Sequence, residues 1–210
     1  MTREERERQT RKEGIIDAAE KLFREKGFDN STMDEIADAA EFTKRTVYSY
    51  FINKEDLYFA VALRITRYYV SVMLRESGAI KSCAEKIEKA GKSYFMFFQN
   101  DPGGFKIISF ARTIHNFEKE SPNHAEMVKE SEKIFEFLAG VIKQGQSEGS
   151  VRKDIDPLMT AYYLAVSIVS ILEMFSVNRP ESELFGVNGE KFLEFYFSMI
   201  LDSIRPAKIL

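Results

Sequence analysis

Apolar residues recur along nearly the whole chain at the spacing of one face of an α-helix, and no stretch alternates with the period of two that is typical of a β-strand. Five prolines interrupt this pattern, at positions 102, 122, 157, 180 and 206. The pattern predicts an all-α protein of about nine helices. The expected helices cover residues 8–26, two short segments within 31–51, and then 54–75, 82–99, 105–118, 123–148, 158–176 and 190–204.

Residues 31–57 are expected to form two short helices joined by a tight turn. Ser31 and Thr32 are good N-cap residues for the first helix, with carboxylates three positions after each, as in a capping box. Thr43 is placed to cap the second helix. The outward side chains of that helix are Lys44, Arg45, Thr46, Tyr48, Ser49 and Tyr50. Because a short helix pair does not need so many exposed donors and rings for its own stability, the pattern indicates a helix-turn-helix that enters the major groove of DNA.

Base readout is expected from the start of this second helix. Lys44 and Arg45 open it and therefore reach base edges or phosphates best, and we expect Arg45 to form a bidentate contact with guanine. Tyr48 and Tyr50 can donate hydroxyls to phosphate or pack on thymine methyl groups. In the alternative interpretation, Tyr48 is partly a core ring.

Contacts with the DNA backbone are expected around this helix. Thr43, Ser49 and Lys54 suit such contacts, as do the N–H groups at the helix start beside Ser31 and Thr32, where phosphate is attracted. In the alternative interpretation, the Ser49 side chain contacts solvent and not DNA. The predicted DNA-binding residues are Ser31, Thr32, Thr43, Lys44, Arg45, Thr46, Tyr48, Ser49, Tyr50 and Lys54.

Residues at many fixed spacings between positions 8 and 58 carry a family resemblance. They are Ile15, Ile16, Ala19, Leu22, Phe23, Gly27, Phe28, Ser31, Thr32, Ile36, Ala37, Thr46, Val47, Tyr48, Tyr50, Phe51 and the run Lys54–Leu57. This pattern resembles the N-terminal DNA-binding domain of TetR-family transcriptional regulators. The resemblance implies a three-helix helix-turn-helix domain at residues 1–54 and a helical ligand-binding and dimerisation domain at 55–210. The function implied is that of a ligand-responsive repressor that binds a palindromic operator as a dimer and is released by a small apolar or amphipathic molecule.

Two positions depart from the family pattern. Glu41 and Arg45 each stand where relatives often have glycine. Glu41 is therefore expected to take the inter-helix turn, with a positive φ and modest strain. Arg45 places a long cation where relatives present bare backbone, so the sequence read by this protein should differ from theirs.

The two last helices, at 158–176 and 190–204, are apolar around most of their circumference. A helix of this kind must be buried on all sides. Two copies of the pair could form a four-helix bundle across a two-fold axis. The alternative is that both helices are simply the core of one chain. The resemblance favours the homodimer, since the family pairs through its last two long helices.

Aromatic residues gather in the expected fifth, sixth and eighth helices. Such a stripe is more often plain core than a ligand site, but the resemblance implies a pocket in this part of the chain. The predicted lining is Tyr94, Phe95, Phe98, Phe110, His115, Tyr162 and Glu173. Glu173 lies on an otherwise apolar helix and needs a partner when buried; it could meet a cationic ligand, pair across the dimer or reach solvent. For His115 a hydrogen-bonded core or surface role is favoured over a ligand contact.

Composition bounds the remaining possibilities. The formal net charge is −3, so DNA binding requires a local cationic footprint rather than an overall basic protein. The N-terminus is charged and no apolar run approaches the length of a membrane span, so a cytoplasmic protein without membrane contact is expected. The single cysteine, Cys83, forms no internal disulfide.

Signals for catalysis are poor. Only two histidines occur, and the sequence holds no metal-binding motif, so we expect neither an enzyme nor a cofactor. Two competing hypotheses remain. The first is a helical small-molecule sensor that has lost DNA readout, in which substitution of Arg45 would leave its function unchanged. The second is a helical enzyme that processes a small molecule, which catalytic turnover would identify.

Overall fold

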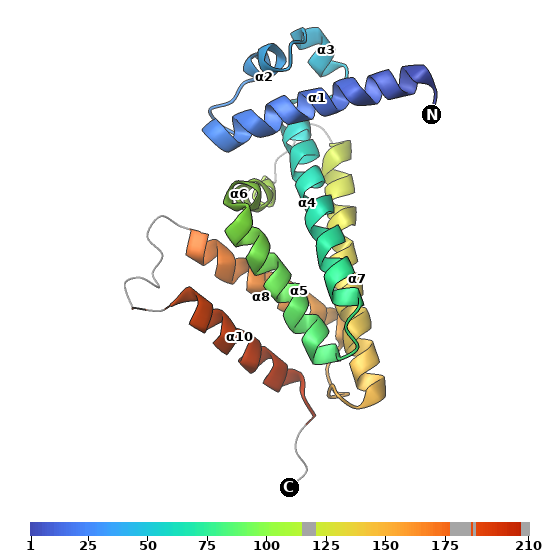
Figure 1. The fold of residues 1–210 in the computed structure, drawn as a ribbon, viewed down its shortest axis with the longest axis vertical. Helices are drawn as coiled ribbons and strands as arrows, with labels where there is room; N and C mark the ends of the chain where they lie inside the picture. Colours follow the sequence, from blue (N-terminus) through green and yellow to red (C-terminus); the bar gives the residue numbers. More distant parts are fainter. Residues whose placement is uncertain (115–120, 177–185, 187, 207–210) are drawn as a thin grey trace. The chain divides into compact units, whose positions relative to one another are not determined.

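The computed structural model describes residues 1–114, 121–176, 186 and 188–206, and every regular element within them is helical. The helices, labelled in Figure 1, are α1 (Arg3–Lys26), α2 (Met33–Ala39), α3 (Lys44–Tyr48), α4 (Lys54–Gly78), α5 (Cys83–Asn100), α6 (Pro102–Ala111), α7 (Pro122–Glu148), α8 (Pro157–Ser176) and α10 (Gly189–Ile204). The predicted all-α class, with an N-terminal helix-turn-helix, is confirmed.

Helix α1 begins five residues before the predicted start. Thr2 is its N-cap: its hydroxyl accepts from the Glu5 N–H at 3.1 Å, and the Glu5 carboxylate accepts from the Thr2 N–H at 2.7 Å. This capping box satisfies two N–H groups that would otherwise lack partners. The extension was missed because residues 3–11 are exposed and carry no apolar periodicity.

The chain packs as two compact units. Unit 1 comprises Met1–Tyr68 and Gly103–Glu130, and unit 2 comprises Tyr69–Pro102 and Ser131–Leu210. The predicted domain boundary at 54/55 lies inside unit 1, because the first part of α4, α6 and the start of α7 pack with the helix-turn-helix. That boundary stays a prediction for where the DNA-binding domain ends.

Unit 1 has an aromatic centre. The Tyr58 ring lies 4.8 Å from Phe23, 5.1 Å from Phe28 and 5.6 Å from Phe110, measured between centroids. The Tyr58 hydroxyl donates to the carbonyl of Ile107 at 3.3 Å, and burial raises the pKa of Tyr58 well above its ordinary value. These rings join α1 and α4 to α6.

A buried carboxylate lies at the start of α4. Asp56 is 2% exposed, and its oxygens accept hydrogen bonds from the Ser121 hydroxyl at 2.7 Å, the Asn123 side-chain amide at 2.9 Å and the Ile52 N–H at 3.3 Å. Ser121 also accepts from the N–H of His124, so it caps α7. The carboxylate thus lies at the N-terminal ends of two helices, where negative charge is stabilised.

Unit 2 is built from the end of α4 together with α5, α8, α10 and most of α7. A side chain on Gly91 of α5 would lie 2.4 Å from the Phe197 ring, so α5 and α10 are in close contact there. The Ser167 and Tyr196 hydroxyls share a hydrogen bond of 2.6 Å between α8 and α10. Cys83 is buried and donates to the Val141 carbonyl, and its burial raises the pKa of the thiol.

Among the described helices, α4 and α8 are long and apolar enough to cross a bilayer by length and composition alone. The expectation that no apolar run approaches this length is therefore wrong. The apolar stretch of α4 is 67% buried, as in a core helix, whereas that of α8 is only 22% buried. One chain leaves much of α8 uncovered.

We expect Glu41→Gly to stabilise the protein. Glu41 has φ 58°, as anticipated from the missing glycine. The left-handed conformation costs a non-glycine residue about 1–2 kcal/mol, and glycine loses about 0.5–1 kcal/mol more entropy on folding, so the free energy of unfolding should rise by about 0.5–1 kcal/mol. Urea denaturation measures it. Glu41→Ala, which removes the same carboxylate but keeps the Cβ, is the control and should change little; an equal gain from both variants would contradict the strain.

We expect Asp56→Ala to destabilise the protein by about 2–4 kcal/mol, because it removes the acceptor shared by Ser121, Asn123 and Ile52 and leaves the buried Ser121 hydroxyl without it. Asp38→Ala is the control, since Asp38 is exposed on α2 and its loss should lie within about 0.5 kcal/mol. Equal effects of the two variants in urea denaturation would show that the Asp56 hydrogen bonds contribute nothing beyond an ordinary surface carboxylate.

Candidate DNA-binding surface and effector groove

The α2–α3 pair is fixed by local hydrogen bonds. Thr32 caps α2 and Thr43 caps α3, where its hydroxyl accepts from the Thr46 N–H at 3.2 Å and lies 2.9 Å from the Thr46 hydroxyl. The Ser49 hydroxyl donates to the Thr46 carbonyl at the other end of α3. Val47 is fully buried, so the opposite side of α3 faces outward. These bonds hold a short helix that would not be stable alone.

The two cations that open α3 differ in their surroundings. Lys44 forms an exposed ion pair of 2.7 Å with Asp34 of α2, and the hydrogen bond to that carboxylate raises the pKa of Lys44. Arg45 is exposed, and no ion pair to it occurs within the described part of the chain. Arg45 is therefore the cation of α3 that can reach a base edge without first breaking an internal bond.

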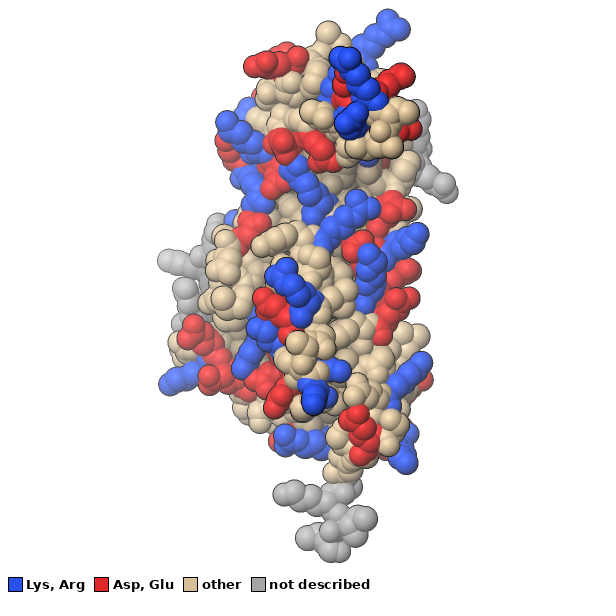
Figure 2. All heavy atoms as spheres, turned by 45° about the vertical axis from the view of Figure 1, so that its right-hand side comes forward, with Lys and Arg blue, Asp and Glu red and all other residues tan. Residues whose placement is uncertain are grey.

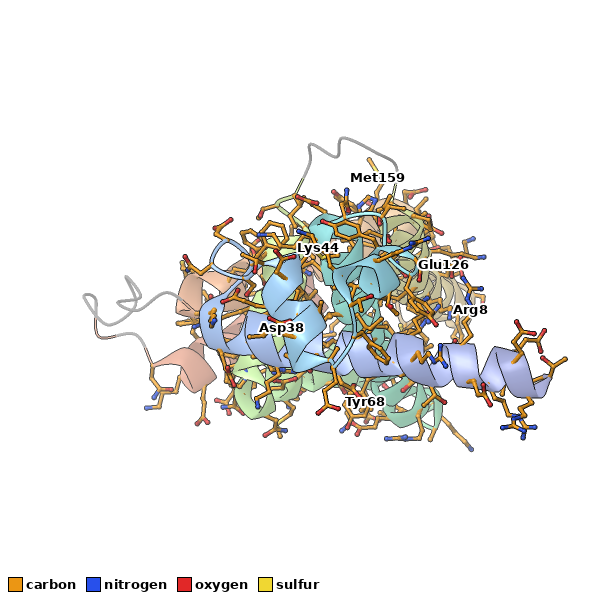
Figure 3. All side chains as sticks on the ribbon, turned by 90° about the horizontal axis from the view of Figure 1, so that it is seen from above. Arg8, Asp38, Lys44, Tyr68, Glu126 and Met159 are labelled. Atoms are coloured by element: carbon orange, nitrogen blue, oxygen red, sulfur yellow. The ribbon has the colours of Figure 1, made fainter. Side chains whose placement is uncertain are left out.

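The aromatic residues of this region are partly exposed. The Tyr48 residue is 45% exposed, whereas Tyr50 is half-buried with the Arg8 guanidinium 5.6 Å from its ring centroid. Figure 3 looks down on this end of the chain and labels Arg8 and Lys44. The pairing of Arg8 with Tyr50 was not predicted, because it joins residues far apart in the sequence.

Ser31 and Lys54 have partners inside the domain. The Ser31 hydroxyl is buried and donates to the Gly27 carbonyl at 2.7 Å. The Lys54 ammonium donates to the carbonyls of Phe28 and Ser31, at 2.9 and 3.0 Å, and lies 4.1 Å from the Phe28 ring centroid. Phosphate contacts from the Lys54 ammonium and from the backbone N–H groups at Ser31 and Thr32 stay a prediction. They would compete with internal bonds, because the Ser31 N–H also donates to the Phe28 carbonyl at 3.2 Å and the Thr32 N–H to the Glu35 carboxylate at 3.0 Å.

Charges on the face of the molecule drawn in Figure 2 are mixed in sign. Figure 2 shows that basic and acidic side chains alternate over the visible face rather than forming a field of one sign. Because salt screens mixed surface charge strongly, specific binding must come from the few cations that contact DNA directly.

The predicted effector residues are not all brought together. Tyr94 is buried against Tyr69 at 4.9 Å, and Phe110 belongs to the aromatic centre of unit 1. Tyr162 is exposed and stacks on Phe135, and Glu173 is half-buried on α8. His115 lies outside the described residues.

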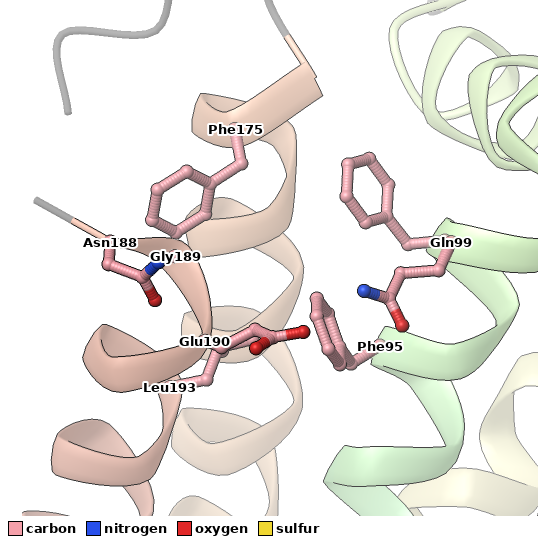
Figure 4. Close-up of a pocket in the computed structure, with 8 residues that line it drawn as sticks. Phe95, Gln99, Phe175, Asn188, Gly189, Glu190 and Leu193 are labelled. Atoms are coloured by element: carbon pink, nitrogen blue, oxygen red, sulfur yellow. The ribbon is translucent and has the colours of Figure 1, made fainter. Parts of the chain in front are cut away.

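Phe95 and Phe98 line a groove between α5, α8 and α10 (Figure 4). Its volume is about 250 Å³. The lining is completed by Gln99, Phe175, Asn188, Gly189, Glu190 and Leu193. The sequence did not point to the residues from α10, because they approach α5 only through the tertiary fold.

The sequence and the fold match known regulators. Residues 15–61 match the family described as bacterial regulatory proteins, tetR family. The activator FasR of Mycolicibacterium smegmatis is 30% identical over 101 residues, which cover 48% of this chain and 46% of FasR, so the match spans about half of that relative. The uncharacterised regulator YhgD of Bacillus subtilis is 24% identical over 196 residues, 89% of this chain and 94% of YhgD.

Solved structures share the helical fold. The transcriptional regulator FadR of Bacillus subtilis, in complex with stearoyl-CoA, superposes with a TM-score of 0.72 at 17% identity, covering 91% of this chain and 98% of FadR. This likeness extends the match from the helix-turn-helix to the C-terminal helices. Residues 15–61 thus match the tetR family of bacterial regulatory proteins, and the chain shares the fold of solved transcriptional regulators.

Proposed function

We propose that the protein is a dimeric cytoplasmic repressor that reads a palindromic operator through Arg45 and is released by a small apolar or amphipathic effector. The observation that carries the DNA readout is the exposed Arg45 at the first turn of α3, free of ion pairs within the described residues. Arginine at such a position can bind guanine O6 and N7 together. Repression is the simplest output, because a dimer that covers one operator blocks polymerase without a further contact.

The support for a dimer is the uncovered apolar face of α8 and α10. The exposed apolar residues on these helices are Leu158, Met159, Tyr162, Tyr163, Val166, Met174, Phe195 and Met199. If these helices were only the core of one chain, such residues would be buried. A second copy would bury the face isologously and set two α3 helices about 34–36 Å apart for successive major grooves.

Helix α4 supports the coupling between effector and operator. It runs unbroken from Lys54 to Gly78, contributing residues to unit 1 up to Tyr68 and to unit 2 from Tyr69. A rearrangement of unit 2 can therefore be transmitted to the DNA-binding helices along this one continuous helix. An effector can shift this equilibrium only by its different affinities for the two arrangements.

Arg45→Ala tests the readout. Loss of a bidentate base contact costs about 1–3 kcal/mol, so the Kd for the operator should rise about 5- to 150-fold. Fluorescence anisotropy against duplexes tiled across the upstream region first identifies the operator, at low and moderate salt. Lys143→Ala is the control, since it removes one exposed cation of unit 2 and should leave the Kd unchanged.

The alternative function gives a different result in the same assay. A helical sensor without DNA readout would bind no tiled or randomly selected duplex with preference, and Arg45→Ala would change nothing. That outcome would overturn the repressor assignment. A reporter fused to the identified operator then distinguishes repression from activation by the direction of change when the gene is deleted.

Phe195→Glu tests the dimer. Phe195 is 61% exposed in one chain, and a buried unpaired carboxylate at an interface costs about 2–5 kcal/mol, so the dimer Kd should rise about 30-fold or more. Sedimentation velocity measures it, and operator affinity should fall in parallel because one protomer binds one half-site. Met96→Glu, at an exposed site on α5, is the matched control. A wild-type monomer, or wild-type protein that sediments with lipid vesicles, would contradict this use of the face.

A further inference from the structure

The groove between α5, α8 and α10 combines aromatic faces with one carboxylate. We propose that it binds an organic cation with a compact apolar body, such as a quaternary ammonium or a protonated aromatic amine, and that this is the chemical class of the effector. The inference rests on the proposed function in assuming that unit 2 receives the effector.

Three phenylalanines supply the aromatic surface. Phe95 and Phe98 lie one turn apart on α5, with near-parallel rings 6.4 Å apart, and Phe175 approaches from α8. Phe175 is held by the Phe192 ring at 5.9 Å and by the backbone of α10, where a Cβ on Gly189 would lie 3.7 Å from its ring. The face of a phenylalanine ring carries partial negative charge and attracts cations, and quaternary ammonium groups are recognised in this way.

Glu190 supplies the charge. In Figure 4 its carboxylate points from the first turn of α10 across the groove toward the Phe95 ring. A carboxylate at a helix start can simply stabilise the helix. Here, however, the Asn188 side chain already caps α10 by accepting from the Lys191 N–H at 3.0 Å. Glu190 also forms no ion pair within the described residues.

The rest of the lining is unfavourable for an anionic ligand. Among the described residues that line the groove there is no lysine, arginine or histidine, and the remaining polar side chains are the neutral amides of Gln99 and Asn188. An anion would meet both the Glu190 carboxylate and the negative ring faces. A cation satisfies both at once, and the volume of about 250 Å³ suits a compact cation rather than a long acyl chain. The groove is thus complementary to charge of one sign.

The probe is phenyltrimethylammonium, and its neutral carbon isostere tert-butylbenzene has the same shape without the charge. Ligand-observed NMR on the full-length protein measures the Kd of each, with benzoate as the anionic probe. We expect the cation to bind about tenfold more tightly than the isostere, with benzoate weakest. Glu190→Gln should remove most of the preference for the cation over the isostere. Phe175→Leu should weaken binding of the cation, because it removes the aromatic ring while keeping an apolar side chain.

Glu132→Gln is the matched control, because it removes one exposed carboxylate from α7 outside the groove and should leave all three Kd values unchanged. Equal binding of cation and isostere, tighter binding of benzoate, or no binding at all would each overturn the proposal. So would the same loss of cation affinity in Glu132→Gln and Glu190→Gln, because it would reflect net charge alone.

Operator binding separates this proposal from the proposed function. Without cation, Glu190→Gln should bind the operator with the wild-type Kd. An unchanged Kd would show that the variant is folded and that its loss of cation binding arises in the groove. Saturating cation should weaken operator binding by the wild-type protein but not by Glu190→Gln. Cation binding without any change in operator affinity would overturn the effector role, whereas failure of the wild-type protein to bind any operator would overturn the proposed function and leave the measured groove affinities standing.

Discussion

The buried carboxylate of Asp56 is the interaction on which the arrangement of unit 1 depends. A charge removed from water is tolerated only when it is hydrogen-bonded, and here every donor comes from a segment that the unit must hold in place. Ile52 belongs to the link between α3 and α4, while Ser121 and Asn123 belong to the start of α7. One side chain therefore fixes the helix-turn-helix to a part of the chain more than sixty residues away.

Other contacts in unit 1 also hold α4 against the N-terminal helices. Arg64 of α4 forms ion pairs with Asp17 and Glu20 of α1, and with Glu13 at 3.7 Å. Lys54 holds the segment between α1 and α2 by hydrogen bonds to two carbonyls. The long helix that leads away from the DNA-binding helices is thus joined to them by charged groups with little freedom. Rotation of α4 would carry α1 with it, which is the condition for moving a reading helix by a change elsewhere.

The parts of the structure that the sequence predicted are those set by local chemistry. Helical periodicity, the Thr32 and Thr43 caps, and the positive φ of Glu41 each follow from residues close together in the chain. The start of α1 was missed because a capping box at Thr2 needs no apolar residue. The DNA-binding set was predicted from helix position and side-chain chemistry, which could not reveal that Ser31 and Lys54 bond inward.

The groove between α5, α8 and α10 was harder to predict because its residues meet only through tertiary packing. Aromatic density in the sequence pointed to Phe95 and Phe98, which line the groove, but it could not separate them from Phe110, which packs in unit 1. Glu173 attracted notice as the charged residue of an apolar helix. The carboxylate that lies in the groove is instead Glu190, which looked like an ordinary residue at a helix start.

Helices α8 and α10 carry both the groove and the apolar face proposed for the dimer. Phe175, Glu190 and Leu193 line the groove, while Tyr163 and Phe195 belong to the exposed face. Because a helix moves largely as a rigid body, a cation that binds as proposed and draws the ends of α8 and α10 toward α5 would also shift the surface of the proposed dimer. Linkage then works in both directions: an effector that changes the dimer geometry has its own affinity changed by dimer formation. Effector binding can therefore alter the spacing of the two DNA-binding domains through the interface itself, in parallel with the path along α4.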